Sequence, residues 1–577
     1  MNLCRVAEAF DPTRFESVGK NSISRKFITT GKKSTFTSCL TMLEASLLTA
    51  RSRDIRLFAI LCLATSSMFL AYIARMHDVT HDAFHQMALA REWFLTGVFP
   101  TNDLFAYTPT VSPVVHHEWA TGVVLYWVAA MSPLGLDGMM LMKLVLTATL
   151  GVVLYRVARG NGAHPIVFFA MVPMVFPVLW VGFATLRAQL FTLVALSLLM
   201  LMLQADWQGK RGWVLLWVPL YLLWLNLHAG FVVGLGLLGF HFAERVLSTI
   251  VNEFQLRKPT SKHSDSIIRQ LREVIMSIGV YQEIAKRHWH LFAMGPLIVF
   301  GLYINPWGWQ YITYLAYAIA MPRPTILEWK PIWFTHDPIT TIVAFIGSIV
   351  FMMYAVRHRN WYRLRGCLFC ALAAYMATKH IRHGSLYAVL WIAMVPAWIT
   401  PTSFGKGMIR LITETRITWI RLASLATILT ICFAMYQPFY RVTLSTDVSP
   451  STYGYPKGVV DYLENNHIHG NVMTPFHCGS YVSWRLYPAV KVSLDGRYEV
   501  AYQPEVMDNH ATFYEALDGW QKTLDKYDHD FLIIPKDAAI YPVLCRHECP
   551  ATAKWNRLYE DDYFALFGGK AEKNSTR

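Results

Sequence analysis

The stretch 212–243 reads GWVLLWVPLYLLWLNLHAGFVVGLGLLGFHFA and contains no Asp, Glu, Lys or Arg. About 20 consecutive apolar residues cross the hydrocarbon core of a bilayer as a helix, so this run is long enough for two crossings. Further charge-free runs lie on both sides of it, at 57–74, 160–186, 188–205, 288–322, 338–356 and 422–440. This pattern predicts a mainly α fold, a polytopic transmembrane helical bundle.

Composition supports this class, because 54% of the 577 residues are hydrophobic and only 16% are charged. The net charge of +14 would also suit a nucleic-acid-binding protein. The basic residues, however, cluster between apolar runs, at 257–272, 357–365 and 406–416. Short loops rich in Lys and Arg are typical of the cytoplasmic side of a membrane protein. The positive charge therefore indicates topology, and we expect membrane lipids but no nucleic acid as partners.

Charge also orients the predicted segments. Residues 1–54 carry nine Lys or Arg against five acids and lack a cleavable signal pattern, so we expect a disordered cytoplasmic tail. The loop 75–118 has two bases and five acids, and the segment from 441 onward has 14 bases and 18 acids. Both belong on the extracytoplasmic side. Counting every apolar run gives 12 spans, whereas the charges require an odd number, which leaves 11 or 13. The number of spans is ambiguous in 119–155, where the sequence PLGLDG at 133–138 interrupts the apolar run.

These features predict three regions. Residues 1–54 are the tail, and 55–440 are the transmembrane domain with the outer loop 75–118 and a cytoplasmic insertion at 247–289. Residues 441–577 read as a small extracytoplasmic α/β domain. In it we expect a helix at 457–465 and strands at 471–474, 490–494, 531–535, 555–559 and 563–567.

The outer loop collects acids and imidazoles beside the membrane, where ionisable groups usually mark a functional site. No Pro or Gly interrupts 78–96, and Gly97 gives a helix stop. On the resulting interfacial amphipathic helix, Asp78, His81, Asp82 and His85 share one face. Two interpretations stay open. The face is either simply solvated, or one of its Asp residues acts as a base or metal ligand.

The end of the loop reads HHEW at 116–119. A His of this pair and Glu118 could converge with Asp82 across the loop. Alternatively, Glu118 merely interacts with the dipole of the next helix, and Trp119 marks the membrane interface.

Other polar groups interrupt apolar sequence. Arg187 stands between two charge-free runs, where a buried pair with a loop acid is one interpretation. The sequence KHIRH at 379–383 lies on the predicted outer side, against the positive-inside trend. An anionic ligand such as a phosphate explains such a basic cluster. Glu328 follows another apolar run.

Cysteine usage carries little functional information. Cys367 and Cys370 form a CxxC inside a predicted span, without further metal ligands nearby, so we favour packing over a zinc or redox role. Cys545 and Cys549 could pair if their compartment is oxidising.

The order of several motifs resembles that of a group of bacterial membrane proteins. These motifs are DxxH at 82–85, PxxDxFxYT at 100–108, HEW at 117–119, RxQLF at 187–191, WxNLH at 224–228, NPxGW at 305–309 and DGR at 495–497. The group looks like a branch of the GT-C glycosyltransferases, close to the protein-mannosyl and lipopolysaccharide-sugar transferases. The resemblance covers almost the whole chain after residue 54.

The resemblance implies a multi-pass protein of the bacterial inner membrane. It implies transfer of a sugar from a polyprenyl-phosphate carrier to an acceptor on the extracytoplasmic face, with a possible divalent metal ion. An acid of the first outer loop is the implied catalytic residue. Asp82 fits best, although its spacing to His85 departs from the family pattern and leaves Asp78 and Asp103 as alternatives.

The remaining implied roles fall on cations and imidazoles. Arg187, Lys379 and Arg382 would stabilise the leaving phosphate, and His85, His117 and His228 would orient groups or move a proton. Asn226 and Glu118 complete the expected substrate-binding set. A non-catalytic scaffold or degenerate transferase is the alternative function. A transporter fits less well, because no internal repeat is evident.

Overall fold

The computed structural model describes residues 79–569 and five earlier positions, 60, 62 and 64–66. Positions left out within 79–569 are 184, 257–275, 322, 324, 325, 336, 360–363, 415–421, 428, 430–440, 447–453 and 547–549. The predicted tail 1–54, the candidate Asp78 and Cys549 therefore lie outside the described residues.

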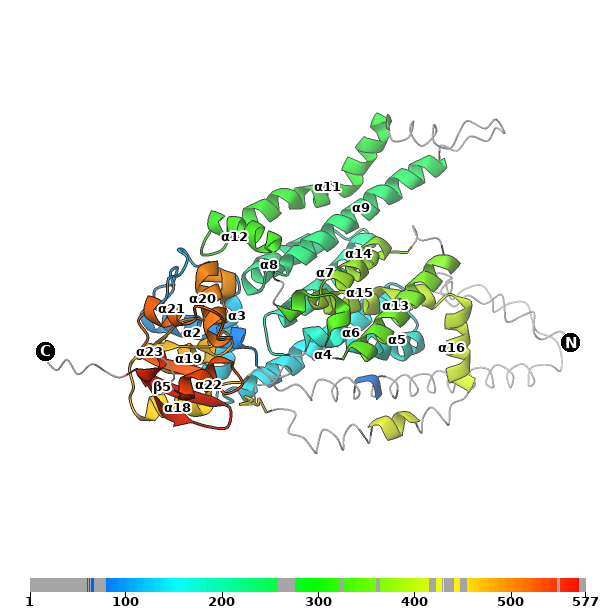
Figure 1. Ribbon diagram of the computed structural model, residues 1–577. Coiled ribbons are helices and arrows are strands. Elements are labelled where there is room, and N and C mark those ends of the chain that lie inside the picture. The colour runs from blue at the N-terminus through cyan, green and yellow to red at the C-terminus, as the bar shows by residue number, and fades with distance from the viewer. Residues whose placement is uncertain are drawn as a thin grey trace, which may run out of the picture. The chain divides into compact units, whose positions relative to one another are not determined.

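Apolar helices dominate the chain before residue 415 (Figure 1). Four of the described helices are long and apolar enough to cross a membrane: α4 (Asp137–Gly160), α7 (Gln189–Trp207), α9 (Phe231–Leu256) and α13 (Pro338–His358). A fifth candidate span is the bent pair Ile381–Ile399 and Ser403–Glu414, which contains α15 (Gly384–Ile399) and α16 (Ser403–Glu414). The predicted fold class, a polytopic helical membrane protein, is confirmed.

Further helices complete the bundle, and all of them except α11 are shorter than the candidate spans. They are α3 (Trp119–Tyr126), α5 (Pro165–Met171), α6 (Phe176–Leu179), α8 (Trp213–Leu227), α11 (Ile278–Gly301), α12 (Trp309–Ala320) and α14 (Cys367–Lys379). The 160–186 run is divided into short turns, because each of its proline residues lacks a backbone donor. The break predicted within 119–155 is also present, since a π-helical turn follows α3 before α4 begins. The strict count of runs thus exceeds the number of long described helices.

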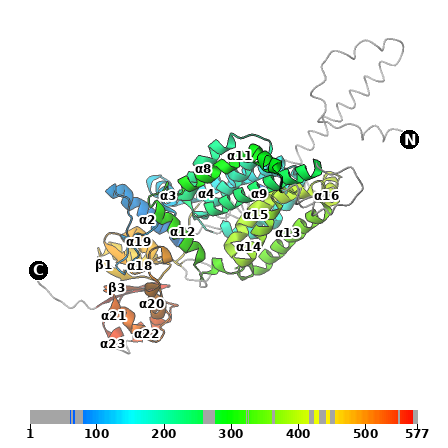
Figure 2. The same cartoon turned by 90° about the horizontal axis from the view of Figure 1, so that it is seen from above.

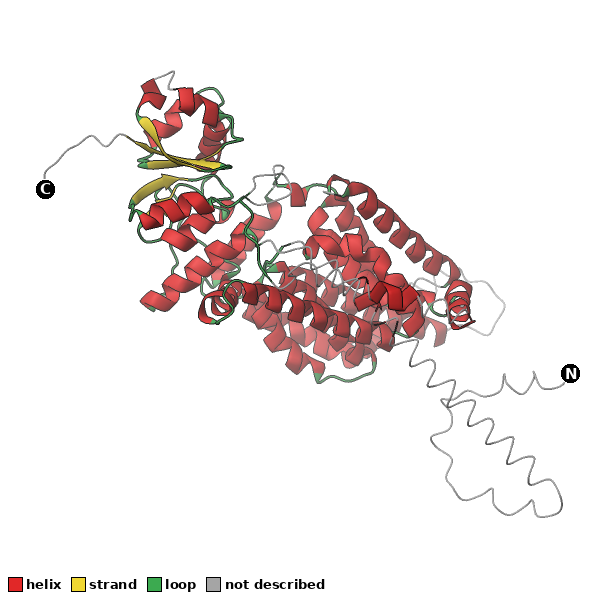
Figure 3. Cartoon of the chain, turned by 90° about the horizontal axis from the view of Figure 1, so that it is seen from below, coloured by secondary structure: helices red, strands yellow, loops and turns green. Residues whose placement is uncertain are grey.

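The C-terminal part contains a five-stranded sheet in the order β2-β1-β3-β5-β4 (Figure 3). The strands are β1 (Gly470–Met473), β2 (Val490–Val492), β3 (Phe531–Pro535), β4 (Trp555–Glu560) and β5 (Phe564–Gly569). The first three pair in parallel, and β5 is antiparallel to β3 and β4. The helices of this part are α18 (Lys457–Asn465), α19 (Gly479–Leu486), α20 (Pro504–Tyr514), α21 (Gln521–Lys526), α22 (Ile540–Arg546) and α23 (Pro550–Ala553). The helix and strands predicted from sequence all form.

The outer loop extends this sheet. The Tyr107 N–H donates to the Val492 carbonyl at 3.1 Å, and the Val492 N–H donates to the Phe105 carbonyl at 2.9 Å. The Val111 N–H then donates to the Ala501 carbonyl at 2.9 Å. Because β2 is an edge strand, the loop satisfies backbone groups that would otherwise be unpaired. The loop between α2 and α3 is thereby attached to the C-terminal sheet.

The loop helix α2 (His81–Thr96) packs against α3 and α19 (Figure 2). It ends at Gly97, whose φ of 69° is the left-handed conformation that glycine adopts without strain. A Cβ at Gly122 of α3 would lie 2.3 Å from the Gln86 carbonyl oxygen, so this crossing requires glycine. Arg91 donates to carbonyls at the end of α19. The helix expected at the membrane interface is therefore enclosed by protein on two sides.

Candidate active site

A short backbone pairing places the start of α2 beside Arg187. Val79 forms a parallel bridge with Leu186, and the Thr80 hydroxyl donates to the Leu186 carbonyl at 3.3 Å. Asp82 follows in the first turn of α2, where the helix dipole favours a carboxylate. Its side chain is 35% exposed. Asp82 thus combines a fixed position with access for a reactant.

Asp82 lies in the electrostatic field of both acids and bases. Burial raises the pKa of its carboxyl group, and the neighbouring Glu118 and Glu328 raise it further. His81 and Arg187 act in the opposite direction, but the net effect is a pKa above the usual 3.8. A carboxylate with a raised pKa is a better proton acceptor than an ordinary aspartate.

Glu118 has the opposite property. Burial alone would raise its pKa, but the hydrogen bond from His117 and the interactions with His117 and His228 lower it to about 2. Gln86 donates to one carboxylate oxygen, and His228 Nε2 lies 3.3 Å from the other. Glu118 is therefore a fixed anion. Two neighbouring acids with oppositely shifted pKa values suggest different roles in one site.

The proton position on His228 follows from its partners. Its Nδ1 accepts the Gly230 N–H at 3.0 Å and lies 2.7 Å from the Thr192 hydroxyl. In the neutral ring, the proton is then on Nε2, which faces Glu118. His117 contacts the same carboxylate at 3.5 Å and stacks on Tyr314. The loop residues His117 and Glu118 thus contact each other, and the charge of Glu118 acts on Asp82.

Two cations flank this cluster. Arg187 forms an ion pair with Glu328, and the Arg382 guanidinium lies 4.8 Å from the centre of the Trp329 ring. Both arginines lower the pKa of Glu328 against the effect of burial, which raises it. Glu328 was absent from the predicted site residues. Its only signal in the sequence is its position as one of two acids, with Asp337, between the apolar runs 288–322 and 338–356.

Two of the predicted substrate-binding residues make other contacts. Lys379 is exposed, with its ammonium 5.5 Å from the centre of the Tyr375 ring. The Asn226 amide accepts from Trp119 Nε1 at 2.9 Å and donates to two backbone carbonyls at 2.8 and 3.0 Å. Asn226 therefore joins α8 to α3 and to the end of α11, which is a structural role.

Asp103 belongs to a separate buried ion cluster. Its carboxylate pairs with Arg497, which also binds Asp495 through Nε at 2.8 and 2.9 Å. The three side chains are at most 2% exposed. Asp103 thus attaches the outer loop to the 495–497 turn, and its carboxylate is not accessible to a substrate.

His85 lies between the two clusters. Its Nδ1 is buried and has no hydrogen-bond partner among the described residues. Burial, Arg497 and His116 lower its pKa well below 6.5, so the ring is neutral at physiological pH. A neutral imidazole with a vacant nitrogen can accept or relay a proton.

Within the described part of the chain, no group of three or more His, Cys, Asp or Glu side chains is arranged to hold a metal ion. Each acid of the cluster already has a partner, since Glu328 pairs with Arg187, Glu118 contacts the imidazoles, and Asp82, the most exposed of the three, lies 3.5 Å from His81 Nε2. The described residues therefore do not form a protein-only metal centre. The CxxC thiols of Cys367 and Cys370 are free and buried in α14.

No protein-family model and no curated protein matches this sequence. The structure is similar to the crystal structure of the Archaeoglobus fulgidus oligosaccharyltransferase in the apo form, with a TM-score of 0.50 and 12% identity. The match covers 90% of this chain and 75% of that chain. A structure of the same enzyme, tethered with an acceptor peptide containing the NVT sequon, gives a TM-score of 0.49 and 11% identity over 90% and 74% of the chains. The first match shows that the fold is similar to that of this oligosaccharyltransferase.

Proposed function

We propose that this protein is a membrane glycosyltransferase that moves a sugar from a polyprenyl-phosphate carrier to an acceptor. The transfer takes place, in this proposal, on the extracytoplasmic face of a bacterial inner membrane. The observation that carries it is the accessible Asp82 carboxyl, with its raised pKa, in the field of Arg187, which together with Arg382 also acts on the neighbouring Glu328. The GT-C-like fold supports the same reaction class.

In the proposed step, a nucleophilic atom of the acceptor attacks the anomeric carbon of the donor sugar. The bond from that carbon to the carrier phosphate oxygen breaks, and its electron pair stays on the phosphate. Asp82 takes the proton that the acceptor loses. A negatively charged carboxylate also stabilises the positive charge that develops on the sugar ring in such displacements.

The departing phosphate gains negative charge, so the site needs cations at that position. Arg187 and Arg382 supply them, and guanidinium groups bind phosphate oxygens in a bidentate manner. Glu328 holds Arg187 in place through its ion pair. Donors that are fixed before the reaction stabilise developing charge without reorganisation.

The proposal is tested by transfer assays on the purified full chain with a panel of polyprenyl-phosphate sugars and lipid-extract acceptors. We expect Asp82→Asn to lose at least about a hundredfold in rate, as removal of a general base does. The matched control is Asp518→Asn, because Asp518 is an exposed acid of the C-terminal part. Equal rates for wild type and Asp82→Asn would contradict the role of Asp82.

A different result would support the scaffold interpretation. Wild-type protein would then turn over none of the donors, and mass spectrometry would detect no co-purified carrier lipid. Expression and monodispersity of each variant must match those of wild type. A loss of turnover can then be attributed to the missing catalytic group and not to misfolding.

A further inference from the structure

The helices that carry the candidate site have a second polar region at their opposite ends. Helix α7 begins two residues after Arg187 and ends at Trp207, and α14 begins at Cys367 and ends just before the 380–383 turn. The 19 residues of α7 rise about 28 Å, which is close to the thickness of the hydrocarbon core. A polar pocket at Trp207 and Cys367 is therefore near the bilayer surface opposite the candidate site.

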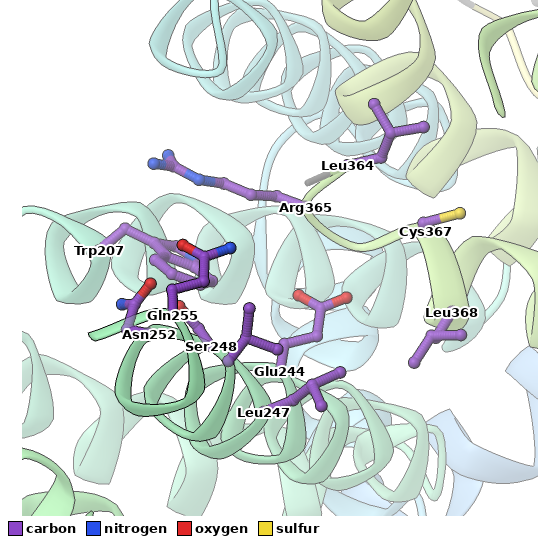
Figure 4. A pocket seen from close by; sticks show the side chains of 11 residues that line it. Trp207, Glu244, Leu247, Ser248, Asn252, Gln255, Leu364, Arg365, Cys367 and Leu368 are labelled. Atoms are coloured by element: carbon purple, nitrogen blue, oxygen red, sulfur yellow. The ribbon is translucent and has the colours of Figure 1, made fainter. Parts of the chain in front are cut away.

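Such a pocket is present and encloses about 300 Å³, the lower end of the range for small-ligand sites. Its polar side chains come mainly from α9 and include Glu244, Ser248, Asn252 and Gln255 (Figure 4). Arg365, just before α14, contributes a guanidinium on the other side. The pocket thus offers one acid, one base, two amides and a hydroxyl within a small volume.

The charged groups are held in place by the fold. Both carboxylate oxygens of Glu244 accept the Gly366 N–H, at 3.0 and 3.2 Å. The Arg365 guanidinium lies 4.8 Å from the centre of the Trp207 ring, a cation–π contact that fixes its position. The pocket therefore has a negative charge at Glu244 and a positive charge at Arg365. This arrangement matches a ligand that carries one positive and one negative charge.

The remaining walls of the pocket are aliphatic. Leu247 is 38% exposed and Leu368 is 39% exposed, and both line the pocket. Exposed leucine side chains on membrane helices contact lipid acyl chains without a cost in solvation free energy. A water-soluble ligand has few apolar groups to bury against them and would gain little binding free energy. A molecule with a charged head and apolar chains therefore fits better than a free metabolite.

We propose that this pocket binds the headgroup of a zwitterionic phospholipid that carries a primary ammonium, such as phosphatidylethanolamine. The phosphate accepts hydrogen bonds from Arg365 and from the amides of Asn252 and Gln255. The ammonium donates to Glu244, and the acyl chains lie along Leu247 and Leu368. Binding of this kind stabilises the bundle at the bilayer surface opposite the candidate site.

The experiment reconstitutes the full chain in nanodiscs with phosphatidylethanolamine or phosphatidylcholine and measures retained lipid by native mass spectrometry. The choline group is fully methylated and cannot donate a hydrogen bond to Glu244. We expect wild type to retain phosphatidylethanolamine about tenfold more than phosphatidylcholine, a preference of about 1.4 kcal/mol, because only the ammonium can donate a charged hydrogen bond to Glu244. Glu244→Gln removes this preference, and Arg365→Met weakens retention of both lipids.

The matched control is Arg357→Met, an exposed arginine near the end of α13 and outside the pocket, which should behave as wild type. Equal retention of the two lipids by wild type, or an unchanged preference in Glu244→Gln, would overturn the proposal. Free phosphoethanolamine is the soluble competitor. Displacement of the lipid by an equimolar amount would assign the pocket to a soluble phosphate ester and would also overturn it.

Discussion

Gly496 lies directly against the imidazole of His81, so that a Cβ added at Gly496 would approach the ring to 2.1 Å. His81 opens α2 and precedes Asp82. The turn 495–497 of the C-terminal part therefore forms one wall of the candidate site. A residue distant in sequence sets the position of the proposed catalytic acid.

Gly496→Ala should reduce sugar transfer by roughly tenfold to a hundredfold, because displacement of a reacting group by about 1 Å has an effect of that size. Gly151→Ala on α4 is the matched control, since a Cβ there meets no other atom within 4 Å. Initial rates at saturating donor are the measurement. Full activity in Gly496→Ala would show that Asp82 tolerates movement of His81.

The pH dependence of transfer follows from the raised pKa of Asp82. A general base must be deprotonated, so the rate should fall as pH drops through a midpoint above 3.8. Glu118, with a pKa of about 2, stays ionised throughout this fall. Because its charge raises the pKa of Asp82, Glu118→Gln should move the midpoint to lower pH. A midpoint that moves to higher pH would contradict this electrostatic assignment.

The buried ion cluster around Arg497 predicts a large effect on stability. Arg497→Met leaves Asp103 and Asp495 as uncompensated buried charges, which should lower the free energy of unfolding by about 3–5 kcal/mol. Arg557→Met is the control, because its ion pair with Glu560 is exposed and contributes at most about 1 kcal/mol. Denaturant titrations in detergent compare the two variants. Similar decreases in the free energy of unfolding would mean that the buried cluster stabilises the protein no more than an exposed ion pair does.

A second buried ion cluster, centred on Asp206, joins the helices at the end opposite the candidate site. The fully buried Asp206 carboxylate accepts hydrogen bonds from His290 at 2.6 Å, Arg211 at 2.7 Å and His241 at 2.9 Å. Asp206→Asn removes the charge that these donors share and should cost about 3–5 kcal/mol.

The change is measured as a lower thermal midpoint in detergent. Asp525→Asn serves as the comparison, because Asp525 is 71% exposed and its contact with Lys554 is 3.4 Å long. An unchanged midpoint in Asp206→Asn would show that the Asp206 hydrogen bonds do not stabilise the bundle.

Local signals in the sequence predicted the local structure well. Gly97 ends α2 as expected, and the strands of the C-terminal sheet form where short apolar segments predict them. These features depend on neighbouring residues, whose spacing is visible in one sequence. The loop 75–118 concentrates acids and imidazoles in the sequence, so their gathering around Glu118 and Asp82 could be predicted, and the catalytic role of Asp82 stays a prediction.

The tertiary pairings were not predictable in the same way. Arg497 pairs with Asp103 across 394 positions, and Arg187 pairs with Glu328 across 141. Nothing in the local pattern distinguishes such partners from solvated charges. The packing of α19 against α2 could not be predicted for the same reason, because α19 belongs to the C-terminal part.

The attachment of the outer loop to β2 also orders events during biosynthesis. The loop leaves the ribosome early, but the strand and the arginine that hold it are made almost 400 residues later. A nascent chain that stops before the sheet can insert its helices and still carries Asp103 without its partner. The loop can therefore reach its final structure only after most of the chain has been made.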